Sequence, residues 1–273
     1  MRESKIKNLF SLKNKIIIIT GGLGFLGQQH IEAVIEAGGI PIALDNNENN
    51  LKKIKQLIFL RYKKNFDYFK CDISNEKKVK NICNKIFKKY QKIDGLINNA
   101  SVNYNSNNIK LKSFEHFNLK NWKKDLSVGL TGTFLCIKYF GEKINLNKDG
   151  GSIINISSDL GIISPDQRLY NNNKKNINIK PVSYSVVKHG IIGFTKFFST
   201  YYKNKKVRVN TLCPGGVFSN NDKSFLKKIK KLIPLNRMAK SGEYKGSIIY
   251  LLSSASSYMN GSNLIVDGGR TAW

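Results

Sequence analysis

Short hydrophobic runs alternate with longer stretches of helical periodicity along the chain. Several of the runs are continuously aliphatic, which is typical of parallel strands that are covered on both faces. We expect strands at Lys15–Thr20, Ile40–Leu44, Phe69–Cys71, Gly95–Asn98, Ser152–Ile156, Val207–Leu212 and Asn263–Val266. We expect helices near residues 25–37, 49–58, 75–91, 119–144, 183–202 and 243–252.

This alternation predicts an α/β fold, a Rossmann-type doubly wound parallel sheet in three layers with right-handed crossovers. No segment rich in Pro, Gly or Ser divides the sequence, so residues 1–273 are expected to form a single domain. Two segments break the rhythm and are expected to be excursions from the domain. One is rich in Asn and Lys, near residues 171–180, and the other is basic, at residues 222–231.

The formal charge of +28 comes mostly from lysines that are spread along the whole chain. Nucleic-acid sites favour clustered Arg with interleaved aromatic residues, so we interpret the charge as a solvated surface and expect no nucleic-acid partner. The longest aliphatic run, Ile16–Ile19, is too short to cross a bilayer, and no apolar signal segment follows the N-terminus. We therefore expect no membrane partner.

The four cysteines stand far apart without a Cys-x-x-Cys pair, and the three histidines have no metal-ligand spacing. These patterns predict reduced thiols, a cytoplasmic location and no metal site.

A glycine-rich loop, Thr20-Gly21-Gly22-Leu23-Gly24-Phe25-Leu26-Gly27, directly follows the first expected strand and opens a helix. Glycines there allow a tight turn and close approach to a pyrophosphate, and the helix N-terminus offers N–H groups and a positive dipole end. The loop residues expected to contact a dinucleotide are Gly21, Leu23, Gly24, Phe25 and Leu26.

Asp45 ends the second strand, and its position after the glycine loop suits a contact with the ribose of an adenosine. A carboxylate there accepts hydrogen bonds from both ribose hydroxyls and repels a 2′-phosphate, and no Arg stands beside it. The sequence therefore favours NAD as the cofactor over NADP.

The sequence resembles the short-chain dehydrogenase/reductase family from about Lys15 to Gly269. The landmarks occur in the family's order. They are the glycine loop, Cys71-Asp72-Ile73, Asn98-Asn99-Ala100-Ser101, Ser157-Ser158, Tyr184-x-x-x-Lys188, Asn210 with Pro214-Gly215, and Asp267-Gly268-Gly269. An ordered set of this kind is far more specific than any one of its motifs.

The resemblance implies a catalytic group of Ser158, Tyr184 and Lys188. Tyr184 is expected to exchange a proton with the substrate oxygen, Ser158 to hydrogen-bond that oxygen, and Lys188 to bind the nicotinamide ribose as well. Tyr184 and Lys188 stand at i and i+4, on one face of the expected helix. An ammonium one turn away is expected to lower the pKa of the phenol. Ser157 is the weaker candidate for the serine role.

The resemblance also implies further cofactor contacts and an assembly. Asn210 is expected to brace the backbone, and Ser219 stands where the family often has Thr. We expect a homodimer or homotetramer formed through the helices at 119–144 and 183–202. The implied cofactor contacts are Asp72, Ile73, Asn99, Ala100, Tyr184, Lys188, Pro214, Gly215 and Val217.

One departure from the family concerns the proton route. Many members carry an Asn on the helix before the fifth strand, where it holds a water that relays protons to the lysine. Gly129 takes that position here, and glycine has no side chain to hold a water. We therefore expect any relay to use another group or a backbone-bound water.

The connection between Ser158 and Tyr184 is long and carries many hydrogen-bonding groups, so we expect it to help select the substrate. Asp166 and Arg168 are its candidate substrate contacts. Such groups suit hydroxyls or a phosphate better than an acyl chain. Together with Val128-Gly129-Leu130-Thr131-Gly132 and the ending Gly268-Gly269-Arg270-Thr271-Ala272-Trp273, the segment is also similar to family members linked to bacterial surface-glycan and flagellin modification. A solvated surface loop is the alternative interpretation.

The sequence therefore predicts an NAD(H)-dependent oxidoreductase that acts on a carbinol or ketone carbon of a small polar substrate, with a sugar derivative favoured. Three alternatives stay open: a reductase of 3-oxoacyl thioesters on an acyl carrier protein, a catalytically silent nucleotide sensor, and a basic RNA-associated protein.

Overall fold

The computed structural model describes residues 4–102, 111, 113–170, 178–202 and 206–273, and its centre is one parallel sheet of seven strands. The strands follow the order β3-β2-β1-β4-β5-β6-β7, and all their pairings are parallel. They are β1 Ile16–Thr20, β2 Ile40–Asp45, β3 Asp67–Lys70, β4 Gly95–Asn98, β5 Gly151–Ile156, β6 Val207–Pro214 and β7 Asn263–Val266. The expected doubly wound fold and its single domain are confirmed.

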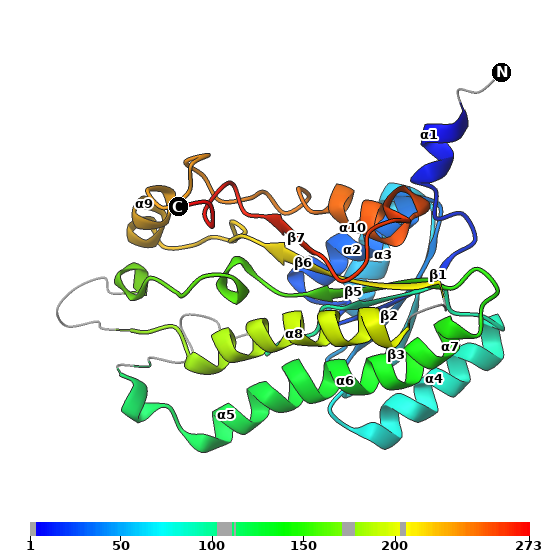
Figure 1. The fold of residues 1–273 in the computed structure, drawn as a ribbon, viewed down its shortest axis with the longest axis horizontal. Helices are drawn as coiled ribbons and strands as arrows, with labels where there is room; N and C mark the ends of the chain where they lie inside the picture. The colour runs from blue at the N-terminus through cyan, green and yellow to red at the C-terminus, as the bar shows by residue number, and fades with distance from the viewer. Residues whose placement is uncertain (1–3, 103–110, 112, 171–177, 203–205) are drawn as a thin grey trace.

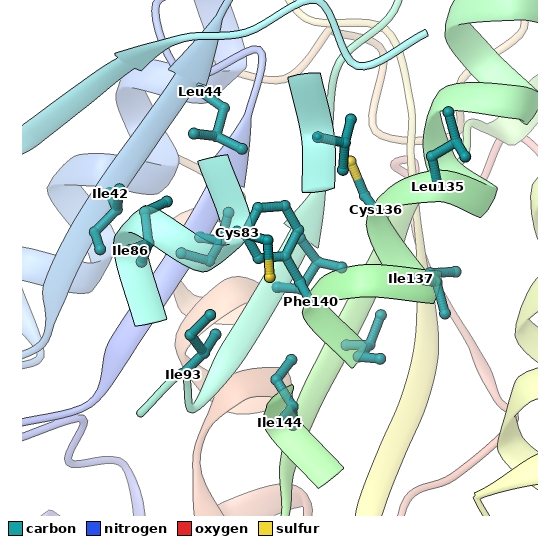
Figure 2. Packing of buried hydrophobic residues seen from close by; sticks show 14 of the residues in the cluster. Ile42, Leu44, Cys83, Ile86, Ile93, Leu135, Cys136, Ile137, Phe140 and Ile144 are labelled. Atoms are coloured by element: carbon teal, nitrogen blue, oxygen red, sulfur yellow. The ribbon is translucent and has the colours of Figure 1, made fainter. Parts of the chain in front are cut away.

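Helices cover both faces of the sheet, which gives three layers (Figure 1). On one face lie α2 Phe25–Glu36, α3 Leu51–Tyr62 and α10 Lys245–Leu252, which pack on a core built from the alternate strand residues Ile17, Ile19 and Ala43. On the other face lie α4 Glu76–Tyr90, α8 Val182–Tyr201 and a long helical segment from Leu119 to Asn145. Figure 2 shows the core of this second face, where Phe140 packs among Ile42, Cys83 and Ile144.

The segment from Leu119 to Asn145 is one continuous helix that contains two π-helical turns. It runs through α5 Leu119–Leu126, a π-helical turn at Ser127–Thr131, α6 Gly132–Cys136, a second π-helical turn at Ile137–Gly141 and α7 Glu142–Asn145. The first of these turns contains Gly129, next to α8 and the catalytic candidates. π-helical turns inside α-helices occur frequently at functional sites.

Two helices were not expected from the sequence. The first is α1 Ser4–Leu9, and the second is α9 Lys223–Lys230, inside the segment that was expected to be a basic excursion. The carboxylate of Asp222 caps α9 by accepting hydrogen bonds from the N–H groups of Ser224 and Phe225. In addition, short 3-10 turns occur at Phe114–His116, Asp159–Gly161, Gln167–Tyr170 and Ser254–Ser256.

A small third core joins α9 to the connection that follows β5. Leu169, Ile229, Ile233 and Met238 are buried together there, and the ring of Tyr170 lies 6.0 Å from that of Phe225. The connection is therefore fixed by packing at 167–170, while residues 171–177 lie outside the described part of the chain. Among the described helices, none is long and apolar enough to cross a membrane.

Candidate active site

Ser158, Tyr184 and Lys188 are brought together by β5 and α8. Ser157 and Ser158 directly follow the last residue of β5, and α8 packs against the 3-10 turn at Asp159–Gly161 that comes next. Within α8, Tyr184 and Lys188 are one turn apart, and the Lys188 ammonium lies 5.7 Å from the centre of the Tyr184 ring. The structure thus brings together the three residues that the sequence analysis selected.

Lys188 is buried and its position is fixed. Its Nζ donates a hydrogen bond to the carbonyl oxygen of Ile156, at 2.9 Å. Burial, together with the nearby charge of Lys180, lowers the pKa of Lys188 to about 8. The group can therefore hold a proton at neutral pH and still lose it under mildly alkaline conditions.

The phenol of Tyr184 differs from the expectation in one respect. Burial raises its pKa above the ordinary value, and a hydrogen bond with Ser158 opposes this shift without cancelling it. The expectation that the neighbouring ammonium would lower this pKa is wrong for the protein as described, because the loss of hydration around the phenolate outweighs the favourable interactions. Tyr184 is consequently protonated at neutral pH, as a proton donor must be.

The two serines after β5 have different partners. The Ser157 hydroxyl donates a hydrogen bond to the carbonyl oxygen of Lys188 at 2.7 Å, which ties β5 to α8. The Ser158 hydroxyl donates to Asp159 Oδ1 at 2.7 Å and accepts from the N–H of Leu160 at 3.2 Å. Ser158 also interacts with Tyr184. Ser157 therefore has a structural contact, and Ser158 lies beside the phenol.

The glycine loop is shaped by contacts with the end of β4. Gly21 has a φ of +61°, and a Cβ there would lie 2.8 Å from Ala100 Cα. The Asn99 amide donates to the carbonyl oxygens of Thr20 and Gly21, and the N–H groups of Asn99 and Ala100 both donate to Thr20 Oγ1. Asn99 and Ala100 thus fix the loop, in addition to any cofactor contact they make.

The start of α2 leaves backbone donors free for a ligand. Its N-cap residue, Gly24, has no side chain to cap the first turn, and Gly24 and Phe25 are exposed. Leu26 is partly buried. The Leu23 side chain is buried, and its N–H and carbonyl oxygen are bonded to Asp45 and Gln28, so Leu23 shapes the loop in this structure. Exposed N–H groups at a helix N-terminus suit a pyrophosphate.

Asp45 lies beside this loop. Its Oδ2 accepts a hydrogen bond from the Leu23 N–H at 3.1 Å, and its Oδ1 accepts one from the Asn47 N–H at 3.1 Å. In the described part of the chain, no Lys or Arg forms an ion pair with this carboxylate. The Asp72 carboxylate is fixed by Ser74, whose N–H and hydroxyl both donate to Oδ1, and the next residue, Ile73, is buried.

The loop after β6 is held from several sides. Pro214 ends the strand, the N–H of Gly215 donates to Val266, and the hydroxyl of Tyr244 donates to the Gly215 carbonyl oxygen at 2.9 Å. Val217 pairs with Ala239 in an isolated bridge. Asn210 braces the backbone as expected, since its amide bonds Met259 and Ser262.

These features together fit a nicotinamide dinucleotide. The glycine loop and the start of α2 would hold the pyrophosphate, and Asp45 would hold a ribose. Lys188 and the loop from Pro214 to Val217 would lie toward the nicotinamide.

The two residues expected to contact the substrate contact each other instead. Arg168 Nε and Nη2 donate to the two carboxylate oxygens of Asp166, at 2.9 and 2.8 Å, and the Arg168 side chain is 87% exposed. The structure does not bring the Arg168 guanidinium into the catalytic group, and the substrate role of this pair stays a prediction.

Sequence reasoning missed three charged residues that do lie at the catalytic group. Arg270 Nη1 donates to Asp159 Oδ2 at 2.6 Å in an ion pair that is almost completely buried. The Lys180 ammonium lies 4.0 Å from the centre of the Tyr184 ring. Two of these residues could have been selected from the sequence, because Asp159 follows Ser158 and Lys180 stands four residues before Tyr184. The pairing of Asp159 with Arg270 could not have been predicted, since the two residues are far apart in the sequence.

Gly129 is in contact with α8, directly beside Lys188. A Cβ at position 129 would lie 2.4 Å from Val187 Cγ1, so the Val187 side chain occupies the space that an Asn would need. The Gly129 carbonyl oxygen accepts a hydrogen bond from Thr133 Oγ1 at 2.8 Å. An Asn-held water is therefore not available in this protein.

Comparison with known proteins agrees with this geometry. Residues 26–271 match a family described as "Enoyl-(Acyl carrier protein) reductase". The chain is 30% identical to Post-translational flagellin modification protein A of Campylobacter coli over 258 residues, which are 94% of this chain and 98% of that protein. It is also 30% identical to 2-dehydro-3-deoxy-D-gluconate 5-dehydrogenase of Bacillus subtilis over 274 residues, covering 97% of each.

A solved structure shows the same agreement in three dimensions. A short-chain dehydrogenase from Leptospira borgpetersenii with bound NAD+ superposes with a TM-score of 0.84 at 30% identity, covering 99% of this chain and 97% of that one. With its parallel sheet, its glycine loop and the group of Ser158, Tyr184 and Lys188, this chain belongs to the short-chain dehydrogenase/reductase family, whose members are oxidoreductases.

Proposed function

We propose that this protein is an NAD(H)-dependent oxidoreductase that interconverts an alcohol and a ketone on a sugar or sugar-derived polyol, in the biosynthesis of a surface glycan. The observation that carries the proposal is the convergence of Ser158, Tyr184 and Lys188 at the end of the sheet that also holds the glycine loop. Retention of all three residues argues against a catalytically silent nucleotide sensor.

In the proposed reaction, Ser158, Tyr184 and Lys188 each have a separate role at the substrate oxygen. A nicotinamide dinucleotide bound at this site would supply or accept the hydride. In the direction of reduction, Tyr184 donates its proton to the substrate oxygen, and the ammonium of Lys188 stabilises the phenolate that remains. Ser158 donates a hydrogen bond to the same oxygen once its hydroxyl turns away from Asp159 Oδ1. In the direction of oxidation, the phenolate accepts the proton.

The preference for NAD over NADP is part of the proposal. It is supported by the carboxylate of Asp45, which lies against the backbone of the glycine loop at Leu23. A 2′-phosphate in that place would meet a negative charge, with no cation in ion-pair contact in the described part of the chain.

A polar substrate is supported by the groups around Tyr184. A pocket for an acyl chain is largely apolar, whereas the Lys180 ammonium lies against the Tyr184 ring, and the buried pair of Asp159 and Arg270 acts electrostatically on its phenol. The names of the flagellin modification and 2-dehydro-3-deoxy-D-gluconate relatives point the same way. The charged surroundings disfavour the 3-oxoacyl-thioester reductase.

We also propose that the protein is a cytoplasmic homo-oligomer. Its four cysteines are all unpaired and buried, which suits a reducing compartment. Phe134 of α6 and Phe197 and Tyr201 of α8 are exposed, and two copies of such an aromatic surface can cover each other.

The test is a turnover assay on the full chain with NAD and NADP and a panel of sugars, polyols and an acetoacetyl thioester. Formation or loss of the reduced nicotinamide absorbance is followed. We expect turnover with a sugar or polyol, at higher kcat/KM with NAD. Turnover with the thioester alone would refute the proposal.

A further inference from the structure

Lys180 is fixed in place directly against the catalytic tyrosine. Its backbone N–H donates a hydrogen bond to Gln167 Oε1 at 2.9 Å. The N–H of the preceding residue, Ile179, donates to the carbonyl oxygen of Leu111 at 3.0 Å. Two residues later α8 begins. The Lys180 ammonium lies 4.0 Å from the centre of the Tyr184 ring, closer than the 5.7 Å of Lys188.

This cation has no anionic partner of its own in the described part of the chain. No carboxylate there lies within 4.0 Å of its Nζ, and no hydrogen bond of the ammonium is formed there. Asp159 is the carboxylate that acts electrostatically on Lys180. Its Oδ1 already accepts hydrogen bonds from the Ser158 hydroxyl and the Leu160 N–H, and its Oδ2 is paired with Arg270. Asp166, which also acts on Arg270, is held by Arg168.

The site therefore carries an excess of positive charge. Lys180 is repelled by Arg270 and acts in turn on Lys188, and Asp159 is the carboxylate that attracts Lys180. Burial lowers the pKa of Lys180 to about 8, which reflects the unfavourable hydration loss of a cation without a counter-ion. A ligand that brings a negative charge would remove this penalty.

We propose that Lys180 binds an oxyanion of the substrate, a carboxylate or a phosphate carried close to the reacting carbon. The proposal deepens the function proposed above and rests on it. The ammonium lies over the ring of the residue that exchanges the proton, so the group it binds belongs to the same part of the substrate. We therefore expect the substrate to be a sugar acid or a sugar phosphate instead of a neutral polyol.

The test measures binding to the full chain saturated with NAD, by calorimetry, for three matched six-carbon probes. D-Gluconate has a carboxylate where sorbitol has a hydroxymethyl group, and sorbitol 6-phosphate carries the phosphate. Wild type is compared with Lys180→Met, which keeps the apolar stem, and with Lys180→Arg, which keeps the charge. Lys120→Met is the matched control, because it removes an exposed ammonium that has no role in the site.

We expect at least one anion to bind wild type more tightly than sorbitol, gluconate if the group is a carboxylate and sorbitol 6-phosphate if it is a phosphate. Lys180→Met should weaken the binding of that anion by about 10- to 100-fold and change the Kd for sorbitol by less than about 3-fold. Lys180→Arg should restore the binding of the anion. The inference is overturned if neither anion binds more tightly than sorbitol, or if Met weakens all three alike. Turnover of neutral polyols without preference for the anions would overturn it and leave the proposed oxidoreductase intact.

Discussion

Removal of the Lys180 ammonium should make the ligand-free protein more stable at neutral pH, which is unusual for a substitution at a catalytic site. The pKa of this group is about 8 in the folded chain, against 10.5 for a free lysine, because burial disfavours the charged form. The unfolded chain then binds more protons than the folded one between these two values. Stability should therefore rise with pH over this range, and the penalty is fully present below pH 8.

The magnitude follows from the difference between the two pKa values, 10.5 and about 8. At about 1.4 kcal/mol for each tenfold change, the upper limit is ~3.5 kcal/mol. The side chain is only partly buried, and its contact with the Tyr184 ring offsets part of the cost, so we expect ~1–3 kcal/mol. For a chain of this size the gain corresponds to roughly 2–10 °C in Tm.

The assay is thermal and urea unfolding of wild type, Lys180→Met and the exposed-lysine control Lys120→Met, each at pH 7 and at pH 10.5. Lys180→Met should be more stable than wild type at pH 7 and nearly equal to it at pH 10.5, while Lys120→Met shows no such difference. A destabilised Lys180→Met at pH 7, or a gain that does not depend on pH, would show that the ammonium is compensated within the protein.

Three further changes test other parts of the structure. Asp45→Arg should reverse the cofactor preference in kcat/KM, and equal use of both cofactors by wild type would remove the role assigned to Asp45. Arg270→Gln leaves the buried Asp159 without its cation, so urea unfolding should show a loss of ~3–5 kcal/mol, and a loss below ~1 kcal/mol would contradict the structural importance of this pair. Gly129→Ala should cost ~1–3 kcal/mol by overpacking against Val187, and adding Val187→Ala should recover most of it; no recovery would mean that the strain lies elsewhere.

The fold was predictable because the strand signals are local. Continuous aliphatic runs such as the one from Ile16 to Ile19 identify strands covered on both faces, and the glycine loop identifies the first crossover. The ends of strands were less accurate. β6 continues to Pro214 because it pairs with β7 up to Val266, and such pairing depends on a distant segment that the local sequence does not reveal.

Helix α9 was missed for a similar reason. The many lysines of this segment mask the helical spacing of its apolar residues, such as Phe225 and Ile229. These residues pack against Leu169, and the local sequence does not show that contact. Ser158, Tyr184 and Lys188 could be selected from the sequence, because β5 and α8 fix the spacing of the motif that carries them. The raised pKa of Tyr184 was not predictable, since it depends on burial by residues far apart in the sequence.

The central claim is that Tyr184 exchanges the proton with the substrate oxygen. The most direct measurement compares wild type with Tyr184→Phe, which removes only the phenolic oxygen, in kcat for the best substrate of the panel and in Kd for NAD. We expect kcat to fall by ~10²–10⁴-fold and the Kd for NAD to change by less than about 3-fold. A Tyr184→Phe enzyme that keeps its kcat within a few-fold of wild type would show that Tyr184 is not the group that exchanges the proton.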